Sequence, residues 1–141
     1  GLSLEQASTI VDAALAKARE LGCKPLTVTV LDAGGHLVAA KREDNSGILR
    51  PQISYAKAWG ALGMGAGSRG LAERAAAAPA FFAALSDVSG GRIVPVAGGV
   101  LVRTGSGYLI GAVGVSGDHP EQDEKCAIFG IEQAGLVADG G

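Results

Sequence analysis

Apolar residues recur at helical spacing over residues 4–21. They follow Ser3, which forms a capping box with Gln6, the sequence signature of a helix start. Gly22 comes directly after the last apolar position, where a glycine ends a helix in the left-handed conformation. The pattern predicts an amphipathic helix. The positions expected on its buried face are Ala7, Ile10, Val11, Ala14, Leu15, Ala18 and Leu21.

A β-hairpin is predicted next, because polar and aliphatic residues begin to alternate. Residues 26–30 place threonines between aliphatic side chains, which is typical of a half-buried strand. Residues 32–35 (Asp-Ala-Gly-Gly) form a turn, and residues 37–41 return as the second strand. Since a turn this short joins neighbouring strands of opposite direction, the pair is antiparallel.

The middle of the chain is predicted to be helical. Pro51 suits the first position of a helix, which a glycine-rich passage at residues 63–70 then interrupts. Residues 71–78 are rich in alanine and continue as a second helix, and Pro79 begins a third, short one.

Strands return in the last third of the sequence. Residues 92–96, 100–103 and 108–115 are rich in β-branched residues and are predicted as three strands. Pro120 opens a final helix that reaches about Leu136.

The predicted strands and helices are segregated along the chain. This order indicates an α+β fold with helices packed on an antiparallel sheet. The length of 141 residues, without a repeat or linker, predicts a single domain over residues 1–141. Hydrophobic residues make up 48% of the chain but aromatic residues only 4%, so the core is expected to consist of small and aliphatic side chains.

Charge and cysteine content exclude several classes of protein. The net charge is −2 and no block of like charge stands out, which argues against binding nucleic acid or an anionic membrane. No apolar run is long enough for a transmembrane helix. Cys23 and Cys126 lack metal-site spacing and are expected to be reduced thiols of a cytoplasmic protein. The chain starts at Gly1, which leaves open a removed N-terminal leader.

Several segments carry a family resemblance in the order in which they occur. They are residues 28–38, 56–58, 91–100, and 111–117 with 121–124. Together they resemble the GlcG/HbpS-like (haem-degrading domain) family, which includes the C-terminal domain of PduO-type proteins. Residues 47–51 and 59–65 depart from the family's commoner pattern close to the expected pocket.

The resemblance implies a profilin-like fold, in which helices flank a five-stranded antiparallel sheet. It also implies assembly into dimers or larger homo-oligomers. Some family members bind or degrade haem and others accompany cobalamin chemistry. A small anionic molecule or a tetrapyrrole is therefore the expected partner, and haem is the candidate cofactor.

Lys57 is the sharpest candidate for chemistry, because it lies in the middle of a run of alanine and glycine. It could serve as a cation, a proton donor or a Schiff-base amine, or it could extend to the surface or pair with an acid. Arg50 and Ser54 share its helical face by their spacing and could bind a carboxylate with it. Alternatively, Arg50 caps a loop or pairs with Glu43 or Asp44.

Further candidates gather at the start of the last helix. Asp118 and His119 could act as acid and base, although Asp118 could equally cap the helix. Gly98, Gly99 and Asp123, from the matching segments, complete the expected ligand-binding set. His36, Met64 and His119 are candidate ligands of a haem iron, and no other metal site is expected.

Residues 65–70 match G-x-G-x-x-G, but a helix and not a strand precedes them, so no nucleotide cofactor is expected. Three hypotheses for function stay open. The first is a small-ligand-binding domain similar to the haem- or tetrapyrrole-binding family members. The second is a small enzyme that acts on a carboxylate-bearing metabolite through Lys57, Arg50 and an acid or base from the 118–119 loop. The third is a structural or sensing oligomer.

Overall fold

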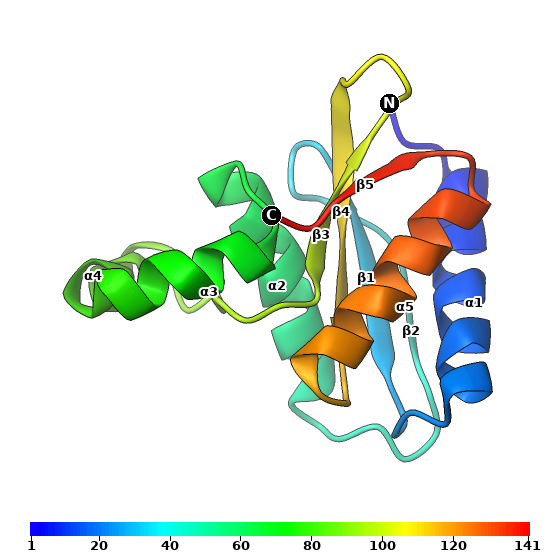
Figure 1. The fold of residues 1–141 in the computed structure, drawn as a ribbon, viewed down its shortest axis with the longest axis horizontal. Coiled ribbons are helices and arrows are strands. Elements are labelled where there is room, and N and C mark those ends of the chain that lie inside the picture. Colours follow the sequence, from blue (N-terminus) through cyan, green and yellow to red (C-terminus); the bar gives the residue numbers. More distant parts are fainter.

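A five-stranded antiparallel sheet lies between two layers of helices in the computed structural model, which describes residues 1–141 (Figure 1). The strand order is β2-β1-β4-β3-β5. This architecture confirms the predicted α+β fold. The strands are β1 (Thr27–Asp32), β2 (Leu37–Arg42), β3 (Gly99–Arg103), β4 (Leu109–Ser116) and β5 (Val137–Asp139).

One face of the sheet is covered by α1 (Leu4–Leu21) and α5 (Pro120–Gln133), and the other by α2 (Arg50–Met64). The capping box of Ser3 and Gln6 is present at the start of α1, as predicted. Valines of β1, β3 and β4 meet small residues of α1 and α5 in the main core. Leu31, Leu101 and Ala112 pack against the alanines of α2 on the opposite face.

Glycines in the strands allow α2 to lie very close to the sheet. A Cβ atom at Gly114 of β4 would overlap the carbonyl oxygen of Ser54, and one at Gly99 of β3 would overlap the carbonyl group of Lys57. The absence of side chains at these strand positions sets the height of α2 above the sheet. It thereby places the side chain of Lys57 against the end of β4.

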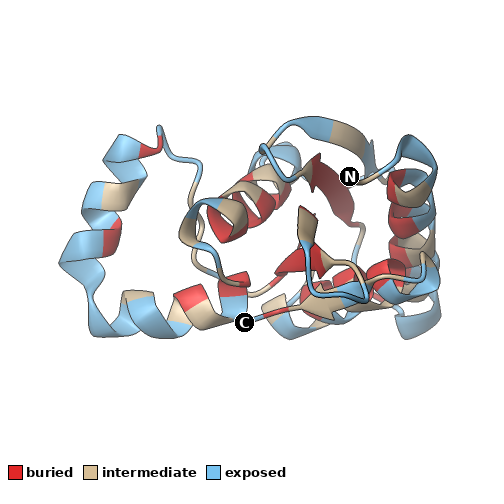
Figure 2. Cartoon of the chain, turned by 90° about the horizontal axis from the view of Figure 1, so that it is seen from above, coloured by how far each residue is buried: buried red, intermediate tan, exposed pale blue.

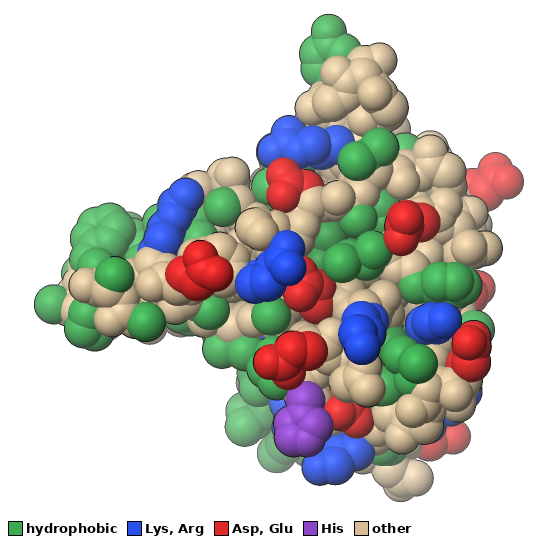
Figure 3. Space-filling view, viewed as in Figure 1, with side chains coloured by type: hydrophobic (Ala, Val, Ile, Leu, Met, Phe, Trp, Pro, Cys, Tyr) green, Lys and Arg blue, Asp and Glu red, His purple; other side chains and the backbone are tan.

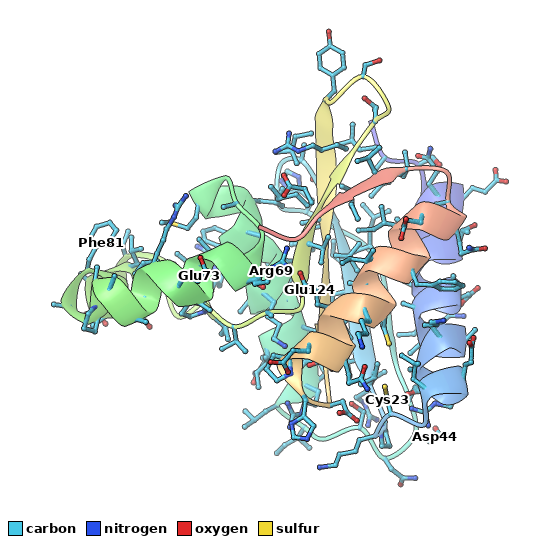
Figure 4. The ribbon with its side chains drawn as sticks, in the orientation of Figure 1. Cys23, Asp44, Arg69, Glu73, Phe81 and Glu124 are labelled. Carbon is cyan, nitrogen blue, oxygen red and sulfur yellow. The ribbon has the colours of Figure 1, made fainter.

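A helical arm formed by α3 (Ser68–Ala77) and α4 (Pro79–Val88) extends away from the sheet (Figure 1). Most of its surface is exposed (Figure 2). Arg69 of α3 and Glu124 of α5 face each other where the arm meets the body (Figure 4), and their Nε and Oε1 atoms are 3.5 Å apart. The Arg69 guanidinium also donates to the carbonyl oxygen of Gly141 at 2.9 Å. These contacts attach the arm to the body.

The prediction of a strand at residues 92–96 is wrong. This segment is irregular and runs alongside α2, where the Cα atom of Ile93 lies 3.2 Å from the position that a Cβ atom of Gly60 would occupy. Its β-branched residues cover a helix and do not extend the sheet. The fifth strand is instead β5, which pairs with β3.

Two helix ends also differ from the prediction. The last helix ends at Gln133 and not near Leu136, because Gly135 adopts φ 75° and turns the chain toward β3. In α2 the helix continues through Gly63 to Met64, and Gly65 ends it at φ 70°. No helix of the structure combines the length and the apolar composition that a membrane crossing needs.

Candidate functional site

A cleft of about 310 Å³ opens between the start of α2, the irregular segment before β3 and the start of α5. Charged side chains, including histidine, gather at the end of the molecule where α5 begins (Figure 3). The cleft combines such groups with an aliphatic wall. Its lining residues are Arg50, Ile53, Lys57, Val94, Val96, Asp118, Pro120 and Asp123.

Lys57 lies at the base of this cleft and is 3% exposed. Its ammonium nitrogen donates to the carbonyl oxygen of Val115 at 2.9 Å and to Oδ2 of Asp123 at 3.2 Å. An ammonium group has three N–H donors, so these two bonds leave one donor for a further acceptor. Lys57 therefore pairs with an acid and keeps hydrogen-bonding capacity toward the cleft.

The pair of Lys57 and Asp123 joins the two helical layers, because Lys57 belongs to α2 and Asp123 to α5. The lysine side chain passes Gly98, whose φ is 122°. A Cβ atom at Gly98 would lie 2.8 Å from the Lys57 nitrogen. Gly98 and Gly99 thus make room for Lys57 and do not line the cleft, which explains their place beside the site.

Burial dominates the electrostatics of this pair. It lowers the pKa of the Lys57 ammonium, against the attraction of Asp123, and the positive charge of Arg50 lowers it further. Burial likewise raises the pKa of the Asp123 carboxyl, although Lys57 opposes that shift. Both shifts move the pair toward sharing a proton between the amine and the carboxylate.

Arg50 enters the same cleft from the first turn of α2. Its Nη1 atom donates to the hydroxyl oxygen of Ser116 at 3.1 Å. Because Lys57 bonds to the preceding residue, Val115, the two cationic groups converge on the end of β4. Arg50 does not form the alternative ion pair with Glu43 or Asp44, and Glu43 pairs with Arg19 instead.

Ser54 does not join these two residues in the cleft. It is fully buried, and its hydroxyl group hydrogen-bonds the hydroxyl of Thr29 in β1. Helical spacing placed Ser54 on the same side of α2 as Arg50 and Lys57, but the short side chain of Ser54 faces the sheet. The longer side chains of Arg50 and Lys57 reach the last two residues of β4.

The loop before α5 is held by two carboxylates that accept hydrogen bonds from backbone amides. The carboxylate of Asp118 accepts from the amide of Lys24 at 2.7 Å and from that of His119 at 2.6 Å, and the Lys24 amide lowers the pKa of this carboxyl most. Asp123 in turn accepts from the amide of Asp118 at 3.0 Å. His119, and not Asp118, occupies the N-cap position of α5, and it is exposed beside the cleft.

A shallow apolar hollow of about 240 Å³ adjoins the cleft and shares Arg50 and Ile53 with it. Gly47, Ile48 and Leu49 form the rest of the hollow, and Ile48 is 93% exposed. We refer to Ile48, Leu49 and Ile53 as the apolar shelf. Sequence reasoning did not identify this surface, although an Ile-Leu pair in a polar loop was a signal for it.

The three candidate iron ligands do not come together. His36 lies in the β1–β2 turn, where its ring nitrogen is 3.2 Å from Oδ1 of Asp32. Met64 ends α2, fourteen residues from Arg50, which corresponds to about 21 Å along a helix axis. His119, by contrast, neighbours two cleft residues, Asp118 and Pro120.

Both cysteines are buried and unpaired, and they lie in the main core. Burial raises the pKa of the Cys126 thiol to about 12. A thiol with this pKa is a poor nucleophile and a poor metal ligand at neutral pH. The cysteines therefore belong to the packing and not to the site.

Comparison with known proteins identifies the class of this domain. A family model described as "Haem degrading protein HbpS-like" matches residues 2–132, and the chain belongs to this family. An uncharacterised 15.0 kDa protein encoded between dhaT and dhaS in Citrobacter freundii is 32% identical over 126 residues, which cover 89% of this chain and 87% of that protein.

The corrinoid adenosyltransferase PduO of Citrobacter freundii is 27% identical over 126 residues, or 89% of this chain. The match spans only 37% of the length of PduO. Among solved structures, a complex of PduOC with haem superposes with a TM-score of 0.86 at 26% identity and covers 96% of each chain. These similarities confirm the family that the sequence motifs had indicated.

We predict that Lys57→Met destabilises the fold strongly. It leaves the Asp123 carboxylate buried without its counter-ion, which costs about 3–5 kcal/mol. The double variant Lys57→Met/Asp123→Asn removes that charge and keeps an acceptor for the Asp118 amide, so it is expected to be more stable than Lys57→Met. The free energy of unfolding from urea titration measures both.

Lys41→Met is the matched control, because Lys41 pairs with Asp12 at 2.8 Å on the surface, where the side chains are 62% and 60% exposed. This variant is expected to change the free energy of unfolding by less than about 1 kcal/mol. Equal effects of Lys57→Met and Lys41→Met would contradict the structural role given to the buried pair.

Proposed function

We propose that this domain binds haem, with propionate carboxylates in the cleft at Arg50 and Lys57 and the macrocycle against the apolar shelf. The observation that carries the proposal is the adjacency of these two surfaces, which share Arg50 and Ile53. A flat apolar molecule with carboxylates on one edge matches such an arrangement. Membership of the family and the haem complex of PduOC support the same ligand class.

The unused hydrogen-bond donors of the cleft favour an anion. The carboxylates of Asp118 and Asp123 already accept hydrogen bonds from backbone amides and from Lys57. Arg50 donates to Ser116 only, and a guanidinium has five N–H donors in a geometry that suits a carboxylate. Arg50 therefore supplies most of the unused hydrogen-bond donors of the cleft, and Lys57 adds one more.

The size of the cleft sets how such a ligand would lie. A volume of about 310 Å³ is at the lower end for ligand pockets, so the cleft suits one edge of a larger molecule. The rest of the ligand would cover the shelf, where Ile48 and Leu49 are exposed. Aliphatic side chains supply this apolar surface, in agreement with the low aromatic content of the chain.

His119 is the candidate iron ligand that fits this arrangement, because it neighbours the cleft and is exposed. A bound haem would supply an iron centre. The imidazole of His119 could hold that iron from the protein side. His36 and Met64 lie in other parts of the molecule and do not belong to the proposed site.

Self-association stays a prediction, and the helical arm is the surface on which we expect it. Phe81 and Val88 of α4 are 56% and 84% exposed. Apolar side chains are visible at the tip of the arm in Figure 3. Such exposed apolar surface on a projecting element is typical of protein–protein contacts.

Replacement of Arg50 tests the carboxylate part of the site. Arg50→Ala is expected to weaken haem affinity by about 10- to 100-fold, because a hydrogen bond to a charged group contributes about 1.5–3 kcal/mol. Titration of the purified protein followed by Soret absorbance measures the dissociation constant. Arg74→Ala, an exposed arginine on the arm, is the matched control and should leave the affinity unchanged.

Replacement of Ile48 tests the apolar shelf. Ile48→Ser should weaken haem binding by roughly tenfold, since burial of part of an isoleucine against the macrocycle contributes about 1.5 kcal/mol. Val88→Ser is the control, because Val88 is also largely exposed but lies on the arm. If both serine variants weaken binding alike, haem associates with apolar surface in general and the proposed shelf is wrong.

His119→Ala tests iron coordination. Loss of an imidazole ligand should change the Soret position of the bound haem, because the axial ligand sets the electronic structure of the iron. His36→Ala, at the distant β1–β2 turn, should give the spectrum of the unmodified protein. An unchanged spectrum for His119→Ala would show that another group holds the iron.

A further inference from the structure

We propose that Lys57 is also a nucleophile, which captures the carbonyl group of a small 2-oxo carboxylic acid as a Schiff base while Arg50 binds its carboxylate. This activity goes beyond haem binding, although it uses the same cleft. It rests on three observations: the placement of the amine, the position of Arg50, and the presence of a proton acceptor in contact with the amine.

The amine is placed for attack from the base of the cleft. Two of its three donors bond to Val115 and Asp123, and the third position has no partner in the protein. Gly98 lets the amine lie at this position, because any Cβ atom there would come within 2.8 Å of the nitrogen. A small carbonyl group can therefore approach the nitrogen from the cleft, which Lys57 lines.

The two cationic groups line one cleft and are placed to meet one small 2-oxo acid. Arg50 reaches Ser116 and Lys57 reaches Val115, which are consecutive residues of β4. In a 2-oxo acid the carboxylate carbon is bonded directly to the carbonyl carbon, so one small molecule can meet both groups.

Asp123 completes the chemistry as proton acceptor and donor. Its carboxylate, 3.2 Å from the ammonium nitrogen, takes one proton and leaves a neutral amine. Burial favours this transfer, because it lowers the pKa of Lys57 and raises that of Asp123. The acid is therefore protonated when the amine attacks.

The step is balanced without any further reactant. The nitrogen lone pair forms a bond to the carbonyl carbon, and the carbonyl π electrons move to oxygen, which receives a proton from the nitrogen. Asp123 then returns its proton to this hydroxyl group, which leaves as water while the carbon–nitrogen double bond forms. The sum is ammonium plus ketone to iminium plus water, and Asp123 ends as the carboxylate.

Reductive trapping tests the proposal on the haem-free protein. Pyruvate serves as the probe, sodium borohydride reduces any iminium, and peptide mass spectrometry locates the adduct. Labelling is expected on Lys57 in preference to Lys41, whose side chain is 62% exposed. The label on Lys57 should saturate with pyruvate concentration, and acetone, which lacks the carboxylate, should label it less.

Variants separate a built site from general lysine reactivity. Arg50→Ala should reduce labelling of Lys57 by pyruvate about tenfold more than it reduces labelling by acetone, and Arg74→Ala should change neither. Labelling of all lysines in proportion to their exposure, or no label on Lys57, would overturn the proposal. Because the readout comes from the unmodified protein, a folding defect of Lys57 variants does not affect it.

This experiment and the haem titration fail independently. A protein that binds haem but is not labelled on Lys57 retains the proposed function and loses the carbonyl chemistry. A protein that is labelled on Lys57 but gives no saturable Soret change shows the reverse.

Discussion

The ion pair between Lys57 and Asp123 connects the two helical layers across the end of the sheet, and the site depends on it. Lys57 comes from the helix on one face and Asp123 from a helix on the other. The same carboxylate accepts from the amide of Asp118 and so shapes the loop that carries His119. One interaction thus sets the positions of the amine, the loop and the cleft between them.

Such a pair is costly to bury, because both charges lose their hydration. Two aliphatic residues of similar size would fill this space with comparable or better stability. Stability therefore does not by itself account for an amine and a carboxylate at this place, which is consistent with the proposed role of the pair in a binding site. The backbone is adapted to this pair as well, because Gly98 and Gly99 leave the room that Lys57 occupies.

Family membership and the particular surface of this chain contribute different information. The sheet and the start of α5 carry the motifs shared with the HbpS-like family, and they hold Lys57 and Asp123 in place. Ile48 and Leu49 of the apolar shelf lie in residues 47–51, where the sequence departs from the commoner pattern. The family thus accounts for the framework, while the proposed ligand contacts combine Lys57, from a matching segment, with Arg50 and the shelf, from the departing one.

Local patterns in the sequence were sufficient for the α+β class, the capped first helix and the hairpin, because each of these elements follows from neighbouring residues. They also identified Lys57 and Arg50, since charged residues in an apolar or helix-start context stand out. Tertiary structure alone decided that residues 92–96 cover α2 and that β5 completes the sheet, because the same β-branched residues satisfy either role. It also decided the partner of Lys57, which lies 66 residues away along the chain and meets it only after both layers pack on the sheet.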